Sequence, residues 1–183
     1  MTVTLKEKQK KVYEVMKPSF GYKNLMETPR ISKIVVSSGV GSIKDKKKIE
    51  LVAKRLETIT GQKAAKRGAK KSVAGFKVRE GDVVGYQVTL RGARMYGFLE
   101  KLLNVALPRT RDFRGISANG IDQMGNYSLG IKENTIFPET ADEELKDVFG
   151  LSITIVTTSN NKAETKAFLT ELGFPFKKEE AKK

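Results

Sequence analysis

The sequence contains no cysteine, no histidine and no tryptophan. Without cysteine the chain can form neither a disulfide, nor a thiolate nucleophile, nor a cysteine-based zinc site. Without histidine it also lacks the commonest general base, the commonest metal ligand and the side chain that ordinarily titrates near neutral pH. These absences argue against an enzyme and against a bound metal, and no cofactor is expected.

Long apolar stretches are missing as well. No run approaches the roughly 18 apolar residues that a bilayer-spanning helix requires, and the first residues lack the continuous apolar centre of a signal peptide. A chain of 183 residues with 39% hydrophobic content is long enough to bury one sizeable core. We therefore expect a cytoplasmic protein that has no membrane partner and requires no homo-oligomer.

The chain is strongly basic, with a formal net charge of +14 that is unevenly distributed. Residues 1–114 carry 27 Lys and Arg against 10 Asp and Glu, whereas residues 115–183 carry 8 against 11. This asymmetry predicts two surfaces for two different partners. Nucleic acid is the obvious partner for the basic part, because each neutralised phosphate releases counterions.

Hydrophobic spacing predicts an α+β protein. Strands are expected over residues 30–41, 82–91, 125–131 and 151–158, and helices over 4–17, 45–60, 93–107 and 161–172. Pro18 and Gly21 are expected to break the first helix after residue 17, and Val105 to face the core from the third. The pattern predicts one domain over residues 1–183, with 79–82 as a candidate boundary between subdomains and 177–183 as a polar tail. Its sheet would be mainly antiparallel, with helices on one face and the other face open for RNA.

Strand alternation indicates which side chains lie on that open face. In DVVGYQVTLR the apolar residues Val84, Tyr86, Val88 and Leu90 point one way, which leaves Gln87, Thr89 and Arg91 on the other side. In the first strand the same alternation leaves Lys33 and Ser37 outside. This is either an ordinary solvated face or a surface for RNA backbone and sugar edges. Because no aromatic residue occupies these positions, we expect it to recognise a folded RNA by shape rather than to stack single strands.

Three charged segments have no place in this alternation. Residues 63–79, KAAKRGAKKSVAGFKVR, contain seven cations and no acid, with Phe76 at the expected loop tip. They form either a disordered cationic loop or a basic arm that follows phosphates. The segment PRTRDFRG could neutralise a helix end, or bind phosphate or carboxylate. ETADEELKDVFG is the acidic cluster, either a solvated helical turn or a patch for a basic protein.

The glycine turn GVGSIK follows a strand and precedes a helix, as a dinucleotide-binding loop does. Lys44 stands where that pattern needs its third glycine, so a tight connection is the simpler interpretation. A nucleotide-binding transferase that uses the turn around Gly39 and Gly41 remains the rival hypothesis of the enzyme class. A phosphate contact from the amides at the start of the following helix is a further option.

Several motifs occur in an order that resembles one known family. They are PRISKIVVSSGVG, TGQK, KKSVAGFKVREG, VTLRGARMYGFLEKLLNVALPRTRDFRGIS, GNYSLGIKE, IFPE, GLSITIVTT and LGFPF. Together they extend over residues 22–176 and resemble the bacterial-type large-subunit ribosomal protein number five. That resemblance implies a structural protein of the central protuberance, which helps attach 5S rRNA to the large subunit. The rival binding-module hypothesis is a free RNA chaperone with the same fold.

The resemblance implies three candidate sites, and the strand alternation supports the first of them. The 5S rRNA surface would consist of Lys33, Ser37, Gln62, Gln87, Thr89 and Arg91. The loop near the P-site tRNA would consist of Lys70, Lys71, Ser72, Val73, Ala74, Gly75, Phe76, Lys77 and Arg79. The bridge to a basic small-subunit ribosomal protein would consist of Arg109, Arg111, Phe113, Arg114, Asp142, Glu143, Glu144 and Asp147.

Large-subunit rRNA and neighbouring ribosomal proteins are further implied partners. The sequence departs from the family at Ser37, where asparagine is usual. A serine has one donor and two acceptor lone pairs and lacks the two-donor amide group of asparagine.

Overall fold

The computed structural model describes residues 4–43, 45–111, 113–140 and 148–177, and its centre is a five-stranded antiparallel sheet. The strands lie in the order β2-β3-β1-β5-β4. Their bounds are β1 Ile31–Gly39, β2 Ala65–Gly68, β3 Val83–Leu90, β4 Tyr127–Ile131 and β5 Leu151–Thr157. Strands from both sides of residues 79–82 therefore pair in a single sheet.

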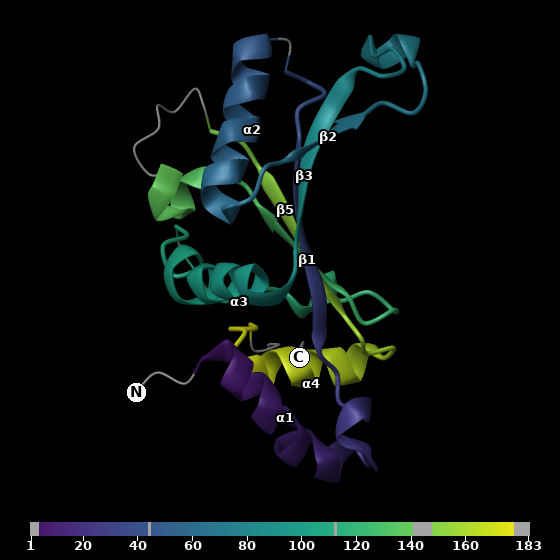
Figure 1. Ribbon diagram of the computed structural model, residues 1–183, viewed down its shortest axis with the longest axis vertical. Coiled ribbons are helices and arrows are strands. Elements are labelled where there is room, and N and C mark those ends of the chain that lie inside the picture. The colour runs from purple at the N-terminus through teal and green to yellow at the C-terminus, as the bar shows by residue number, and fades with distance from the viewer. Residues whose placement is uncertain (1–3, 44, 112, 141–147, 178–183) are drawn as a thin grey trace, which may run out of the picture.

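Four α-helices accompany the sheet in the described residues. Their bounds are α1 Leu5–Phe20, α2 Lys46–Thr60, α3 Gly92–Lys101 and α4 Lys162–Leu172. Helices α2 and α3 lie on one side of the sheet, while α1 and α4 pack against each other near one of its ends (Figure 1). The predicted α+β class and the antiparallel sheet are confirmed. Among the described residues, no helix has both the length and the apolar character needed to cross a bilayer.

The core forms because the strands align their apolar positions. Ile34 of β1 lies opposite Leu90 on β3 and Ile155 on β5, and all three side chains are buried. The next row repeats this arrangement with Val36, Val88 and Ile153. Apolar side chains of the helices cover this face, namely Val52, Leu56, Ile59, Met95, Phe98, Leu99, Phe168 and Leu169. The prediction that alternate apolar residues of the first strand and of residues 82–91 face the core is thereby confirmed.

The expectation that Pro18 ends the first helix is wrong. Helix α1 continues to Phe20 and ends at Gly21, whose φ of 67° is left-handed and whose N–H donates to Lys17 O over 2.9 Å. Proline removes one N–H donor from a helix. So close to the end, that loss is small beside the αL cap that glycine forms readily.

The expectation that Val105 faces the core is also wrong. Five residues, Leu102–Ala106, form a π-helical turn directly after α3. A π turn holds more residues than an α turn and so rotates the positions that follow it. As a result Leu103, Ala106 and Leu107 are buried, whereas Val105 is 38% exposed.

Strand β2 was not predicted, because its four residues AKRG show no alternation of apolar and polar side chains. All four are exposed, and β2 is an edge strand held by β3 alone. Its pairing with β3 makes a hairpin whose loop, residues 69–82, extends beyond the rest of the sheet (Figure 1). The segment that the sequence marked as a basic arm is thus partly a strand.

Candidate nucleic-acid interface

The face of the sheet opposite the core is polar. Lys33 and Ser37 on β1, and Gln87 and Thr89 on β3, are half-buried there, and Arg91 follows β3 as an exposed residue. Alternation of neighbouring side chains places them on this face because the residues between them belong to the core. The structure therefore brings together five of the six residues expected to contact 5S rRNA.

The register arranges these side chains in rows across the strands. Ser37 lies opposite Gln87 on one side and Ser152 on the other, and Ser152 in turn lies opposite Gly130. A second row runs from Thr89 through Val35 and Thr154 to Ser128. Both rows are neutral and carry hydrogen-bonding groups. None of the strand positions on this face carries a carboxylate or an aromatic ring.

Gln62, the sixth expected residue, lies at the edge of this face rather than within it. Its Nε2 donates to Thr89 O over 3.2 Å, beyond the point where β2 begins to pair with β3. The side chain thus satisfies a strand carbonyl that β2 does not reach. One amide N–H of Gln62 thus serves the fold, and its side-chain oxygen is a further group that can accept hydrogen bonds.

Sequence reasoning missed the contribution of β4, β5 and β2 to the interface. Ser152 and Thr154 alternate with buried Leu151, Ile153 and Ile155, so the parity of LSITIVTT already contained this information. Ser128 joins them, and its hydroxyl lies 3.3 Å from that of Thr154. On the other edge, Arg67 of β2 lies opposite Gly85, and this pairing could be recognised only from the structure.

The 69–82 loop is an ordered hairpin extension with hydrogen bonds of its own. Ala69 N donates to Asp82 O and Gly81 N to Ala69 O at its base, and Val73 and Val78 pair again further out. At the tip a single 3-10 turn, Ala74–Phe76, ends at Lys77, which adopts a left-handed φ of 53°. Phe76 is 80% exposed, as expected for a loop tip. The loop presents its cations from a closed frame, which lowers the entropy lost when it binds.

The side chains expected near tRNA are distributed over this frame. Lys70, Lys71, Ser72, Val73, Ala74, Gly75, Lys77 and Arg79 are all exposed. Ser72 also supports the loop internally, because its Oγ accepts from Glu80 N over 2.9 Å. The Asp82 carboxylate likewise accepts from Arg79 N over 2.7 Å.

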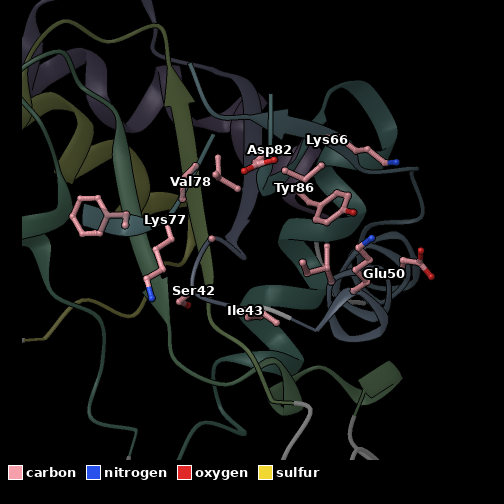
Figure 2. A pocket seen from close by; sticks show the side chains of 14 residues that line it. Ser42, Ile43, Glu50, Lys66, Lys77, Val78, Asp82 and Tyr86 are labelled. Carbon is pink, nitrogen blue, oxygen red and sulfur yellow. The ribbon is translucent and has the colours of Figure 1, made fainter. Parts of the chain in front are cut away.

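A cleft of about 580 Å³ separates the hairpin from α2 on the core side of the sheet. Figure 2 shows its lining, with Lys77 and Val78 of the loop, Ser42 and Ile43 before α2, and Tyr86 and Lys66 of the hairpin. Glu50 and Asp82 also line the cleft and offset two of its lysines. It is therefore nearly neutral, unlike the open face of the sheet.

The glycine turn is a structural connection. Val40, fully buried between its two glycines, donates from N to Val84 O over 2.9 Å and so ties the turn to β3. Helix α2 begins only at Lys46, and the Asp45 carboxylate accepts from Lys47 N over 2.9 Å at its N-terminus. The Asp45 carboxylate thus takes one of the N–H groups that a phosphate would need, and the phosphate contact at this helix end stays a prediction.

The residues expected to bridge to the small subunit are only partly described. Arg109, Arg111 and Arg114 are exposed, and Phe113 is half-buried against the core. Asp142, Glu143, Glu144 and Asp147 lie outside the described residues. Arg111 lines a groove together with Phe113, Ile116 and, at the end of β4, Lys132.

Comparison with known proteins identifies two adjoining family matches in the chain. The model of ribosomal protein L5 matches residues 24–79, and that of the ribosomal L5P family C-terminus matches residues 83–176. The large ribosomal subunit protein uL5 of Fervidobacterium nodosum is 49% identical over 179 residues, which cover 97% of each chain. Its counterpart in Flavobacterium johnsoniae is 50% identical over 179 residues, covering 97% of this chain and 98% of that protein.

Proposed function

The chain belongs to the ribosomal protein L5 family, and from this premise we propose that its open sheet face binds 5S rRNA. The protein is a structural constituent of the large ribosomal subunit and not an enzyme. The prediction that the chain is not an enzyme is thus confirmed by the comparisons. The rival transferase hypothesis has no support from the glycine turn.

One observation carries the proposal for 5S rRNA. Ser37 of β1 and the distant segment with Gln87, Thr89 and Arg91 meet on one face, whose described strand positions carry no carboxylate and which the helices leave uncovered. Phosphate and sugar contacts fix an RNA on such a surface, while its neutral donors and acceptors select the shape. A face without aromatic rings suits a folded RNA better than a single strand.

The 69–82 loop supports a second part of the proposal, a contact with P-site tRNA. A ribosome must accept every tRNA, so such a contact needs cations on a fixed frame and no reading of bases. The hairpin has this character, since its internal hydrogen bonds hold the backbone while Lys70, Lys71 and Lys77 remain exposed. Phe76 at the tip could pack on a ribose or a base.

For the bridge to the small subunit, the two candidate segments have opposite charge and would therefore bind different partners. A basic small-subunit protein would bind the acidic residues 142–147, whereas the arginines of residues 109–114 would favour acidic groups or phosphate. Pairs at such an exposed contact are individually weak, which suits a bridge that has to slide. Reversal of Glu143 and Glu144 to lysine should weaken subunit association, and unchanged subunit profiles in a sucrose gradient would contradict this part.

The central proposal is tested by titrating the full chain with 5S rRNA and with an unrelated RNA of the same size, at two salt concentrations. Preferential binding of 5S rRNA that persists at the higher salt would support a shaped interface. Equal binding that collapses with salt would mean that the net charge alone attracts phosphate, as in a free RNA chaperone. Cosedimentation with large subunits separates the chaperone hypothesis from the ribosomal one.

A further inference from the structure

The open face has cations at two ends and neutral groups between them. At one end, Arg67 of β2 lies opposite Gly85 of β3. Towards the other end of β3 come Gln87 and Thr89, and then Arg91 just after the strand. Lys33 stands at the same end as Arg91, opposite Val156. Arg91 follows Gly85 by six steps along the extended chain, so the two cationic ends are about 20 Å apart at the usual rise.

The neutral middle is rich in hydroxyl groups. Ser37 and Ser152 belong to one row, and Thr89, Thr154 and Ser128 to the next. Ser128 and Thr154 pair through their hydroxyls at 3.3 Å, and either of them can be the donor. A hydroxyl has one donor and two acceptor lone pairs, so each member of this pair still has capacity for an outside partner.

This arrangement matches the minor groove of an A-form duplex. That groove is wide and shallow, displays 2′-hydroxyls and base edges, and is bordered by the phosphates of both strands. A single strand would instead need an aromatic platform, which the described strand positions of this face lack. A 2′-hydroxyl both donates and accepts, as do the serine and threonine hydroxyls that face it.

We propose that the sheet face reads the minor groove of an A-form RNA helix, in which Ser128, Ser152 and Thr154 hydrogen-bond to 2′-hydroxyls while Arg67, Arg91 and Lys33 contact the bordering phosphates. This inference rests on the proposed docking of 5S rRNA on the same face. It adds β4 and β5 to the interface and assigns them the distinction between ribose and a sugar without the 2′-hydroxyl.

Two transcripts and two variants test the inference. One probe is 5S rRNA, and the other is the same transcript made with 2′-fluoro pyrimidines, which keep the A-form sugar pucker but cannot donate a hydrogen bond. The double variant Ser152→Ala, Thr154→Val removes two of the three hydroxyls assigned to 2′-hydroxyls, together with the partner of Ser128, and keeps a β-branched residue at 154. Thr170→Val on α4 is the matched control, because its hydroxyl donates to Lys166 O over 2.7 Å, away from the face. Circular dichroism and thermal melting verify that both variants fold.

The wild-type chain should bind the fluorinated transcript about five- to thirty-fold more weakly, as expected for about two lost hydrogen bonds. The double variant should bind natural 5S rRNA more weakly by a similar factor and should distinguish the two transcripts less than about twofold. Its dependence on salt should equal that of the wild type, because no phosphate contact is removed. Thr170→Val should behave as the wild type in each assay.

The contrary outcomes separate the two levels of the proposal. Equal affinity of the wild type for both transcripts, with 5S rRNA still preferred over an unrelated RNA, would overturn the minor-groove inference alone. An unchanged preference for the natural transcript in the double variant would overturn the assignment to Ser152 and Thr154. No preference for 5S rRNA over unrelated RNA would overturn both the inference and the proposed function.

Discussion

Arg67 of β2 and Gln87 of β3 join the two strands of the hairpin on the open face, where Arg67 Nε donates to Gln87 Oε1 over 2.6 Å. This bond fixes the guanidinium above the face and occupies the amide oxygen of Gln87. The amide nitrogen of Gln87 and the remaining N–H groups of Arg67 are then directed to a partner that accepts hydrogen bonds. An RNA backbone offers such acceptors.

We therefore expect Arg67→Ala and Arg91→Ala each to weaken 5S rRNA binding by about 1–3 kcal/mol and to lower the salt slope by about one. Filter binding over a series of salt concentrations measures both quantities. Lys162→Ala, an exposed cation at the start of α4, is the control and should change neither. Wild-type affinity in both arginine variants would contradict the location of the interface.

The double variant Lys70→Ala, Lys71→Ala should bind 5S rRNA almost as the wild type does, because both lysines lie on the 69–82 loop beyond the sheet face. The same variant should reduce P-site tRNA retention on reconstituted ribosomes. A nitrocellulose titration with 5S rRNA and a tRNA retention assay measure the two effects. A large loss of 5S rRNA binding would reassign the loop to the 5S interface.

Lys101 holds three elements together at the end of α3. Its Nζ donates to Ile59 O in the last turn of α2 over 2.7 Å and pairs with Glu139 Oε1 at 2.5 Å. Lys101→Met should lower the free energy of unfolding by about 1–2 kcal/mol, because the Ile59 carbonyl loses its charged donor. Glu139→Gln should cost less than about 1 kcal/mol, since the ion pair is partly exposed. Urea denaturation compares them, and equal losses would contradict this ranking.

Alanine substitutions at Gly125 and Gly61 distinguish the cost of a left-handed backbone from the cost of a steric clash. Both have a positive φ, of 74° and 67°, but a Cβ at Gly125 would lie 2.3 Å from Ser159 O, whereas one at Gly61 has nothing within 4 Å. Gly61→Ala should cost about 1 kcal/mol from the left-handed backbone alone. Gly125→Ala should cost clearly more, because the backbone of Ser159 has to move. Thermal melting of the two variants tests this difference, and equal losses would show that the turn adapts freely.

Tyr127 should make the protein sensitive to alkaline pH. Burial raises the pKa of its phenol from 10.0 to about 12, and its hydroxyl donates to Ser117 O over 3.1 Å. The folded state therefore retains a proton that the unfolded state releases, so this contribution is complete below pH 10 and is lost as the pH rises towards 12. The free energy of unfolding of the wild type, measured relative to that of Tyr127→Phe, should therefore decrease as the pH is raised from about 10 to about 12. A difference that is constant with pH would contradict the assignment.

The sequence by itself determined the class of the fold, the family and half of the interface. Alternation in DVVGYQVTLR separates Gln87, Thr89 and Arg91 from the core residues Tyr86, Val88 and Leu90, because neighbouring side chains of a strand point to opposite faces. This property is local, so it needs no knowledge of which strands pair. The ordered motifs were specific for the same reason, since they were read directly along the chain.

Only the tertiary structure decided which strands lie side by side. That Thr154 and Ser128 continue the row of Thr89, and that Arg67 reaches Gln87, depends on pairings between segments far apart in the chain. The short edge strand β2 has no alternation of apolar and polar residues to predict it, because all four of its residues are exposed. The π turn that turns Val105 outward is decided in the same way, by how Leu103, Ala106 and Leu107 fill the core. Local pattern specifies the face of a residue, and non-local packing specifies its neighbours.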